Sequence, residues 1–142
     1  MIESAMHNWG DNGYVSTHLN VNKLFVEWVP VGNVCLRDWK HSFYKIFQKL
    51  EYHQSFFKQI RWLNDLTNFE SAGLAQLKFL QQYVNGKAGK YFPPIKIAFV
   101  KPKDLLGLAA MHGYTSPSTI CCARVKIKVF DTKEQALEWL NK

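Results

Sequence analysis

The chain has 142 residues, of which 47% are hydrophobic and 20% are charged, and its formal net charge is +7. These values are typical of a folded protein of one domain and exclude an intrinsically disordered chain. The positive charge would attract nucleic acid, an anionic membrane surface or an acidic protein. However, the 18 Lys and Arg residues are scattered along the sequence, which disfavours a dedicated nucleic-acid site.

Residues 1–13 are predicted to form a flexible leader, because they show no periodicity and end in the turn-forming run Gly10-Asp11-Asn12-Gly13. One α/β domain is expected over residues 14–142. No apolar run reaches the roughly 18 residues that span a bilayer, and the first residues lack the basic and apolar regions of a signal peptide. We therefore expect a cytoplasmic protein without membrane insertion.

A hairpin and a helix are predicted in the first part of this domain. Apolar residues alternate with polar ones over residues 15–21, which predicts a half-buried strand. A turn at residues 22–23 leads into a nearly continuous apolar strand, residues 24–29, which is expected to be central and to end at Pro30. Apolar residues at intervals of three and four then predict a helix over residues 36–50.

Strands and helices alternate through the middle of the chain. Residues 57–63 are predicted to form a strand, and a helix with an apolar inner side is expected through residues 74–84. The apolar run at residues 95–100 is typical of a strand in a parallel sheet. A short helix is expected over residues 103–111.

The last strand and helix carry clear signals. Residues 125–129 alternate between apolar residues and lysine, which predicts a strand at an edge of the sheet with one solvated face. Thr132 and Gln135 form a capping-box pattern, which predicts the start of a final helix. The whole order is β-β-α-β-α-β-α-β-α. It predicts an α/β fold with a mostly parallel five-stranded sheet, right-handed crossovers and one N-terminal hairpin strand at an edge.

The usual sequence motifs of enzymes are missing. There is no His-Glu-x-x-His, Gly-x-Ser-x-Gly, Cys-x-x-Cys or Gly-x-Gly-x-x-Gly pattern. The histidines have no ligand-like spacing to one another or to Cys35, and Cys35 and His41 lie near the start of one predicted helix without a third orienting group. The sequence therefore predicts a protein that is not an enzyme and holds neither a metal nor a cofactor.

One junction is more informative, because residues 63–74 run from the end of a predicted strand into a predicted helix. In an open parallel sheet, ligands and partners usually bind at the carboxyl ends of the strands. Thr67-x-x-Glu70 is a capping-box pattern, which would place Ser71 in the first turn of the helix with no regulatory role.

The same junction resembles a known family. Asp65-Leu66-Thr67, followed by Glu70-Ser71-Ala72-Gly73-Leu74, is similar to the signature of the STAS domain of anti-sigma-factor antagonists. Residues 32–39 and 129–140 also resemble the SpoIIAA-like branch of this superfamily. The resemblance extends over about residues 15–141 and implies a SpoIIAA-like (STAS) fold in a bacterial regulatory protein.

The resemblance implies a partner as well as a fold. In antagonists of this family, a serine at the start of the second helix is phosphorylated by a partner kinase that is also the anti-sigma factor, and phosphorylation breaks the complex. Ser71 is the matching residue in this chain, so the resemblance makes Ser71 a candidate phosphoacceptor. The phosphorylated and the purely structural interpretations of Ser71 both remain open at this point.

The sequence thus predicts a non-catalytic protein-interaction module, with an anti-sigma-factor antagonist as the more specific hypothesis. Asp65, Thr67, Glu70 and Ser71 are predicted to lie at the partner surface, and Gly73 to permit close approach. Self-association into a homodimer is a further option. The alternative is a carrier or sensor of a small apolar ligand, because many aromatic residues fall near the first two helices. They are Trp39, Phe43, Phe47, Phe56, Phe57, Tyr83, Tyr91 and Phe92.

Overall fold

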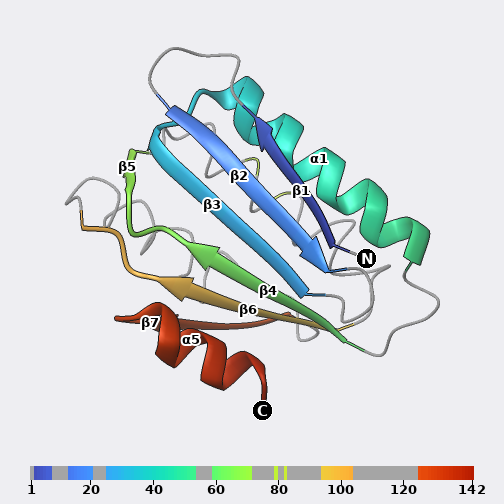
Figure 1. Ribbon diagram of the computed structural model, residues 1–142, viewed down its shortest axis with the longest axis vertical. Helices are drawn as coiled ribbons and strands as arrows, with labels where there is room; N and C mark the ends of the chain where they lie inside the picture. The colour runs from blue at the N-terminus through green and yellow to red at the C-terminus, as the bar shows by residue number, and fades with distance from the viewer. Residues whose placement is uncertain are drawn as a thin grey trace.

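Figure 1 shows the computed structural model of the chain, which describes residues 2–7, 13–20, 25–53, 59–71, 79, 82, 94–103 and 125–142. This part of the chain contains seven strands and two helices. In chain order they are β1 (Ile2–His7), β2 (Gly13–Asn20), β3 (Phe25–Asn33), α1 (Leu36–His53), β4 (Ile60–Asp65), β5 (Phe69–Ser71), β6 (Ile95–Val100), β7 (Val125–Phe130) and α5 (Lys133–Leu140).

The strands form one sheet in the order β1-β2-β3-β4-β6-β7, and the short strand β5 pairs with β3 beside this path. The pairs β1–β2 and β2–β3 are antiparallel, whereas β3, β4, β6 and β7 run parallel to one another. The α/β class, the N-terminal hairpin and the edge position of β7 are therefore confirmed. The sheet is wider than the five strands predicted, because β1 and β5 add to it.

Strand β1 corrects the predicted leader. It pairs with β2 along its whole length, from Ile2 opposite Asn20 to His7 opposite Val15. The prediction of a flexible segment is therefore wrong for residues 2–7, and residues 8–12 lie outside the described part. The local pattern of residues 2–7 is too weak to reveal a strand. The unpaired backbone edge of β2 supplies the hydrogen-bonding partner instead.

Strand β3 continues past Pro30 to Asn33, which also differs from the prediction. The ladder between β3 and β4 covers only Phe25 to Trp28, and pairing on that side resumes when Gly32 meets Phe69 of β5. Proline has no N–H to donate and is therefore tolerated where a strand lacks a neighbour on one side. Pro30 fits inside β3 because it lies in this interval.

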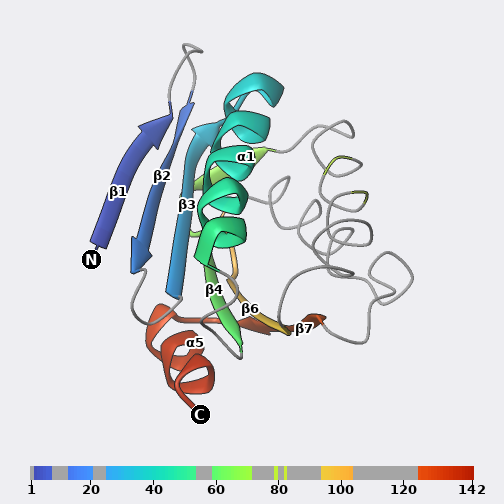
Figure 2. The same cartoon turned by 90° about the vertical axis from the view of Figure 1, so that its right-hand side faces the viewer.

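The two helices cover opposite faces of the sheet (Figure 2). Helix α1 packs over a large apolar cluster that includes Val26, Ile60 and Trp62, while α5 packs over a smaller one that includes Leu63 and Ala98. Successive residues of a strand point to opposite faces, so Trp62 and Leu63 of β4 enter different clusters. The parallel strands β4 and β6 are therefore buried on both faces, as their apolar sequences predict.

Trp28 lies at the centre of the larger cluster. Its ring centroid is 4.7 Å from that of Trp39 and 4.7 Å from that of Phe43. Its Nε1 donates a hydrogen bond to Ser42 Oγ at 3.0 Å, and Ser42 Oγ donates to the carbonyl oxygen of Trp39 at 2.8 Å. The indole N–H of Trp28 is thus satisfied inside the core, which avoids the penalty of an unpaired buried donor.

The aromatic residues considered for a ligand pocket divide into two groups. Trp39, Phe43 and Phe47 are only 2%, 3% and 3% exposed, and they belong to the core cluster beneath α1. These three side chains therefore fill the core. The other five lie outside the described residues: they are Phe56, Phe57, Tyr83, Tyr91 and Phe92.

Some of the remaining predicted elements are confirmed, and others lie largely outside the described residues. The helix at residues 36–50 is confirmed as α1, the strand at residues 95–100 is confirmed as β6, and Thr132 caps α5 by accepting a hydrogen bond from the Gln135 backbone N–H at 3.3 Å. In the predicted helix at residues 74–84 only Phe79 and Gln82 are described, and both are helical. The predicted helix at residues 103–111 lies outside the described residues except for Lys103.

Neither α1 nor α5 has the length and apolar character needed to cross a bilayer.

Candidate functional site

The predicted junction lies at the carboxyl end of β4 (Figure 1), but it does not lead directly into a helix. After a turn, Phe69–Ser71 forms strand β5, which pairs in parallel with Gly32 and Asn33 of β3. The interpretation of Thr67 and Glu70 as a helix capping box is therefore wrong. Phe69 explains the difference, because its side chain is 2% exposed and its ring centroid lies 5.5 Å from that of Trp39. Burial of this ring holds the segment against the sheet.

Asp65 fixes the shape of the turn that follows β4. Its Oδ1 accepts hydrogen bonds from the Thr67 backbone N–H at 3.2 Å and from Thr67 Oγ1 at 2.5 Å. An aspartate that bonds the backbone two residues ahead forms an Asx turn, a common means of closing a loop. The Asp65 carboxylate is therefore engaged within the turn, so Asp65 acts as a positioning residue.

The turn is also tied to three other segments by backbone hydrogen bonds. The Leu66 N–H donates to the carbonyl oxygen of Val100 at 3.2 Å, and the Lys103 N–H donates to that of Thr67 at 3.2 Å. On the other side, the Gly32 N–H donates to the carbonyl oxygen of Asn68 at 2.8 Å. These bonds fix the turn between the ends of β3 and β6, so its outer surface is pre-organised.

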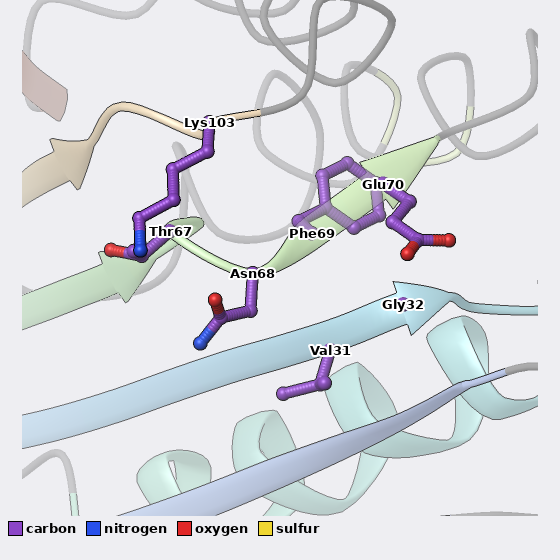
Figure 3. Close-up of a pocket in the computed structure, with 7 residues that line it drawn as sticks. All are labelled: Val31, Gly32, Thr67, Asn68, Phe69, Glu70 and Lys103. Carbon is purple, nitrogen blue, oxygen red and sulfur yellow. The ribbon is translucent and has the colours of Figure 1, made fainter.

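A groove of about 510 Å³ lies over this turn (Figure 3). It is lined by residues from the end of β3, from the turn, from β5 and from the segment after β6. They are Val31, Gly32, Thr67, Asn68, Phe69, Glu70 and Lys103. Gly32 has a φ of 72°, a conformation that side-chain-bearing residues rarely adopt, so glycine is favoured at this point of the wall.

The groove presents polar groups of different kinds. Asn68, Glu70 and Lys103 are exposed, Thr67 is half-buried, and Phe69 is buried. Figure 3 shows the Lys103 side chain extending toward Thr67, whereas Glu70 lies beyond Phe69 at the other end of the groove. An ammonium and a carboxylate at opposite ends suit a ligand surface that carries complementary charges.

Among the described residues, the groove is lined by a carboxylate, an ammonium group and a hydroxyl. Its lining contains neither a cysteine nor a histidine that could act as a nucleophile or a base. Within the described ranges, no group of three His, Cys, Asp or Glu side chains is placed to hold a metal ion. The groove is suited to recognition by hydrogen bonds and charge.

The structure brings together some of the predicted site residues. Thr67 and Glu70 line the groove, and Asp65 shapes it from within. Ser71 is the last residue of β5 and lies in register with Asn33 of β3, while Gly73 falls outside the described residues.

Sequence reasoning missed several lining residues. They are Val31, Gly32, Asn68, Phe69 and Lys103. Asn68 and Phe69 could have been found from their place in the junction. The other three come from segments that only the sheet order brings alongside, so no local signal marks them.

Known proteins match this chain in structure but not in sequence. No protein-family model matches the sequence, and none of the curated proteins matches it. Among solved structures, the chain is similar to the crystal structure of an uncharacterized protein from the DUF3478 family, with a SpoIIAA-like fold, from Shewanella loihica PV-4. The two chains are 19% identical, the match covers 98% of this chain and 93% of that chain, and the TM-score is 0.53.

The chain has a SpoIIAA-like fold. The fold implied by the sequence resemblance is thereby confirmed, and at this level of identity the comparison concerns the fold alone. The groove of this SpoIIAA-like domain lies at the carboxyl ends of parallel strands, where open α/β sheets commonly bind their ligands.

Proposed function

We propose that this SpoIIAA-like domain is a non-catalytic protein-interaction module and that the groove over the β4–β5 turn binds the partner. The observation that carries the proposal is the pre-organised turn: backbone bonds from Leu66, Gly32 and Lys103 hold it in place while Asn68 and Glu70 remain exposed. A surface that is already ordered pays little conformational entropy when it binds.

The lining residues define the chemistry expected of the partner. The Glu70 carboxylate suits an ammonium or guanidinium group, and the Lys103 ammonium suits a carboxylate. The Asn68 amide can both donate and accept hydrogen bonds. We expect a polar protein surface with charges of both signs, spaced to meet Glu70 and Lys103.

A photo-crosslinking side chain at Asn68 tests this surface in the full chain. We expect it to form a defined product with one protein in the native cell extract, and Glu70→Lys in the same chain to reduce that product because the new charge repels the partner's cation. The matched control carries the crosslinker at Tyr52, which is 80% exposed near the carboxyl-terminal end of α1 and does not line the groove. Identical products from the two positions would contradict the proposal.

The more specific hypothesis is a partner switch of the anti-sigma-factor antagonist kind, with Ser71 as the phosphoacceptor. It rests on the sequence resemblance and on the place of Ser71 in β5, directly after the groove residue Glu70. A phosphate on Ser71 would add about −1.5 to −2 charges one residue along the chain from Glu70. Phosphorylation would then release the partner through charge repulsion without unfolding the domain.

Substitutions at Ser71 separate this switch from simple binding. Ser71→Asp is expected to weaken the Asn68 crosslink to the partner severalfold, whereas Ser71→Ala should preserve it, because only the aspartate imitates the added charge. The yield of crosslinked product at equal protein concentrations gives the comparison. Equal yields from the two variants would remove the switch while leaving the interaction surface in place.

A further inference from the structure

A second polar surface lies on the α5 side of the sheet, near the amino-terminal ends of β4, β6 and β7. In the strand register, Arg61 of β4 lies opposite Lys96 of β6, and Lys96 lies opposite Lys126 of β7. Neighbouring strands are about 4.8 Å apart, so these three residues place cations in a row that spans about 10 Å. We call Arg61, Lys96 and Lys126 the cation row.

Two hydrogen bonds show which face the row occupies. Arg61 Nη1 donates to Asn141 Oδ1 at 3.2 Å, and Lys96 Nζ donates to the carbonyl oxygen of Trp139 at 2.8 Å. Both acceptors lie at the carboxyl-terminal end of α5, which packs against this face (Figure 2). Lys126 shares the face because directly opposed residues of neighbouring strands point to the same side.

Lys96 lies among other positive charges. Burial, followed by the nearby charges of Lys126, Arg61 and Lys142, lowers the pKa of Lys96 below its usual value. Like charges directly opposite each other destabilise a sheet, and the carboxyl-terminal dipole of α5 supplies only about half a negative charge. Among the described residues, no ion pair joins Lys96, Lys126 or Lys142 to a carboxylate.

A groove of about 350 Å³ adjoins the row, a volume within the range of small-molecule sites. It is lined by Lys128, Phe130, Gln135, Glu138, Trp139 and Lys142. The rings of Phe130 and Trp139 lie 5.6 Å apart, and Lys96 Nζ lies 4.6 Å from the centre of the Trp139 ring. Trp139 and Lys142 therefore connect an aromatic wall with the cation row.

Two ion pairs bound the described positive surface on one side. Toward the amino-terminal end of α5, Lys101 pairs with Asp131 at 2.9 Å and Lys133 pairs with Glu27 at 3.2 Å. These carboxylates offset the lysines there, so among the described residues of this face the lysines without an ion pair are Lys96, Lys126, Lys128 and Lys142. A surface of this extent fits a compact anion better than a long polymer, whose backbone would need a continuous positive track.

We propose that the cation row and the adjoining groove bind a small phosphate ester: Arg61, Lys96 and Lys126 contact its phosphate groups, and the rest of the molecule lies against Phe130 and Trp139. Two or three linked phosphates match the length of the row, and their charge removes the repulsion among its members. An aromatic or apolar group beside the phosphates is suited to the ring wall. This site is separate from the partner groove, so the proposal does not depend on the proposed function.

Calorimetric titration of the full chain with tripolyphosphate, ATP and adenosine tests the proposal. We expect saturable binding of ATP and of tripolyphosphate at about 1 mM or below, with ATP the tighter of the two and adenosine much weaker than both. Lys126→Gln should weaken ATP binding about tenfold, since Lys126 is exposed and its loss removes one charged contact. Lys142→Gln, at another exposed residue, should act in the same direction.

The matched control is Lys45→Gln, which makes the same change of charge at an exposed residue of α1, on the opposite face of the sheet. It is expected to change ATP affinity less than about twofold, because a distant surface charge is largely screened by salt. Equal weakening by Lys45→Gln and Lys126→Gln, or no saturable binding of ATP and tripolyphosphate, would overturn the proposal. Binding of an oligothymidylate about a hundredfold tighter than ATP would also overturn it, by assigning the surface to nucleic acid.

Discussion

Trp28→Ala is expected to lower the free energy of unfolding by about 3–5 kcal/mol, the usual effect of deleting a large buried aromatic side chain. Trp28 is 1% exposed, and its ring contacts those of Trp39 and Phe43 at the centre of the core. Its loss would leave a cavity between β3 and α1 and would deprive Ser42 Oγ of the donor that it accepts from. Because small domains are stable by only about 5–15 kcal/mol, this loss is a large fraction of the total.

Urea denaturation followed by circular dichroism measures this effect. Tyr52→Ala is the matched control, since it also truncates an aromatic residue but one that is 80% exposed, and it should change the free energy of unfolding by less than about 0.5 kcal/mol. If Trp28→Ala and Tyr52→Ala gave similar midpoints, the described core would be incorrect.

Phe69→Ala is expected to destabilise the domain by about 3–5 kcal/mol and to disrupt the partner groove at the same time. Phe69 is 2% exposed, packs against Trp39 and is the residue through which β5 pairs with Gly32. Without this ring, little besides backbone bonds would hold the short strand β5 to β3. The groove lined by Asn68 and Glu70 would then lose its fixed shape.

Hydrogen exchange at the Gly32 amide distinguishes the local effect from the global one. This amide donates to the carbonyl oxygen of Asn68 at 2.8 Å, so its protection reports directly on the attachment of the turn. Phe69→Ala should reduce that protection by more than the loss of global stability explains. Glu70→Ala, at the exposed neighbour in the same strand, should leave it unchanged. Unaltered protection in Phe69→Ala would show that the ring does not anchor β5.

Local patterns in the sequence predicted the elements whose stability is largely local. The helix at residues 36–50 has a continuous apolar stripe, and Thr132 caps α5 as its spacing to Gln135 indicates. Strand β1 was missed because residues 2–7 show no clear alternation of apolar and polar residues, so only their pairing with the next strand, β2, defines them as a strand.

Only part of the candidate site could be predicted, because local patterns do not show which segments the fold brings together. The rule that ligands bind at the carboxyl ends of parallel strands pointed to Thr67 and Glu70, and both line the groove. Their capping-box spacing nevertheless predicted the wrong local structure, because burial of Phe69 against Trp39 outweighs the local helix preference. Lys103 enters the groove only because β6 lies beside β4 in the sheet.

The cation row illustrates the limit of composition as evidence. Arg61, Lys96 and Lys126 are at least 30 residues apart in the sequence and were interpreted as scattered charges. The register of three parallel strands sets them side by side. A distribution of charge along a sequence therefore says little about its distribution on a surface until the strand order is known.

In β3, pairing with β4 ends at Trp28 and pairing with β5 begins at Gly32. This interval affects how the binding preference of the domain can change. The groove over the β4–β5 turn opens where β3 and β4 stop pairing, so its existence depends on the path of the main chain. The side chains of Asn68, Glu70 and Lys103 line the opening, but the main chain forms it. Under the proposed function, exchanging them should alter which protein is recognised while leaving the opening itself intact, so that one scaffold can acquire new binding preferences through a few surface substitutions.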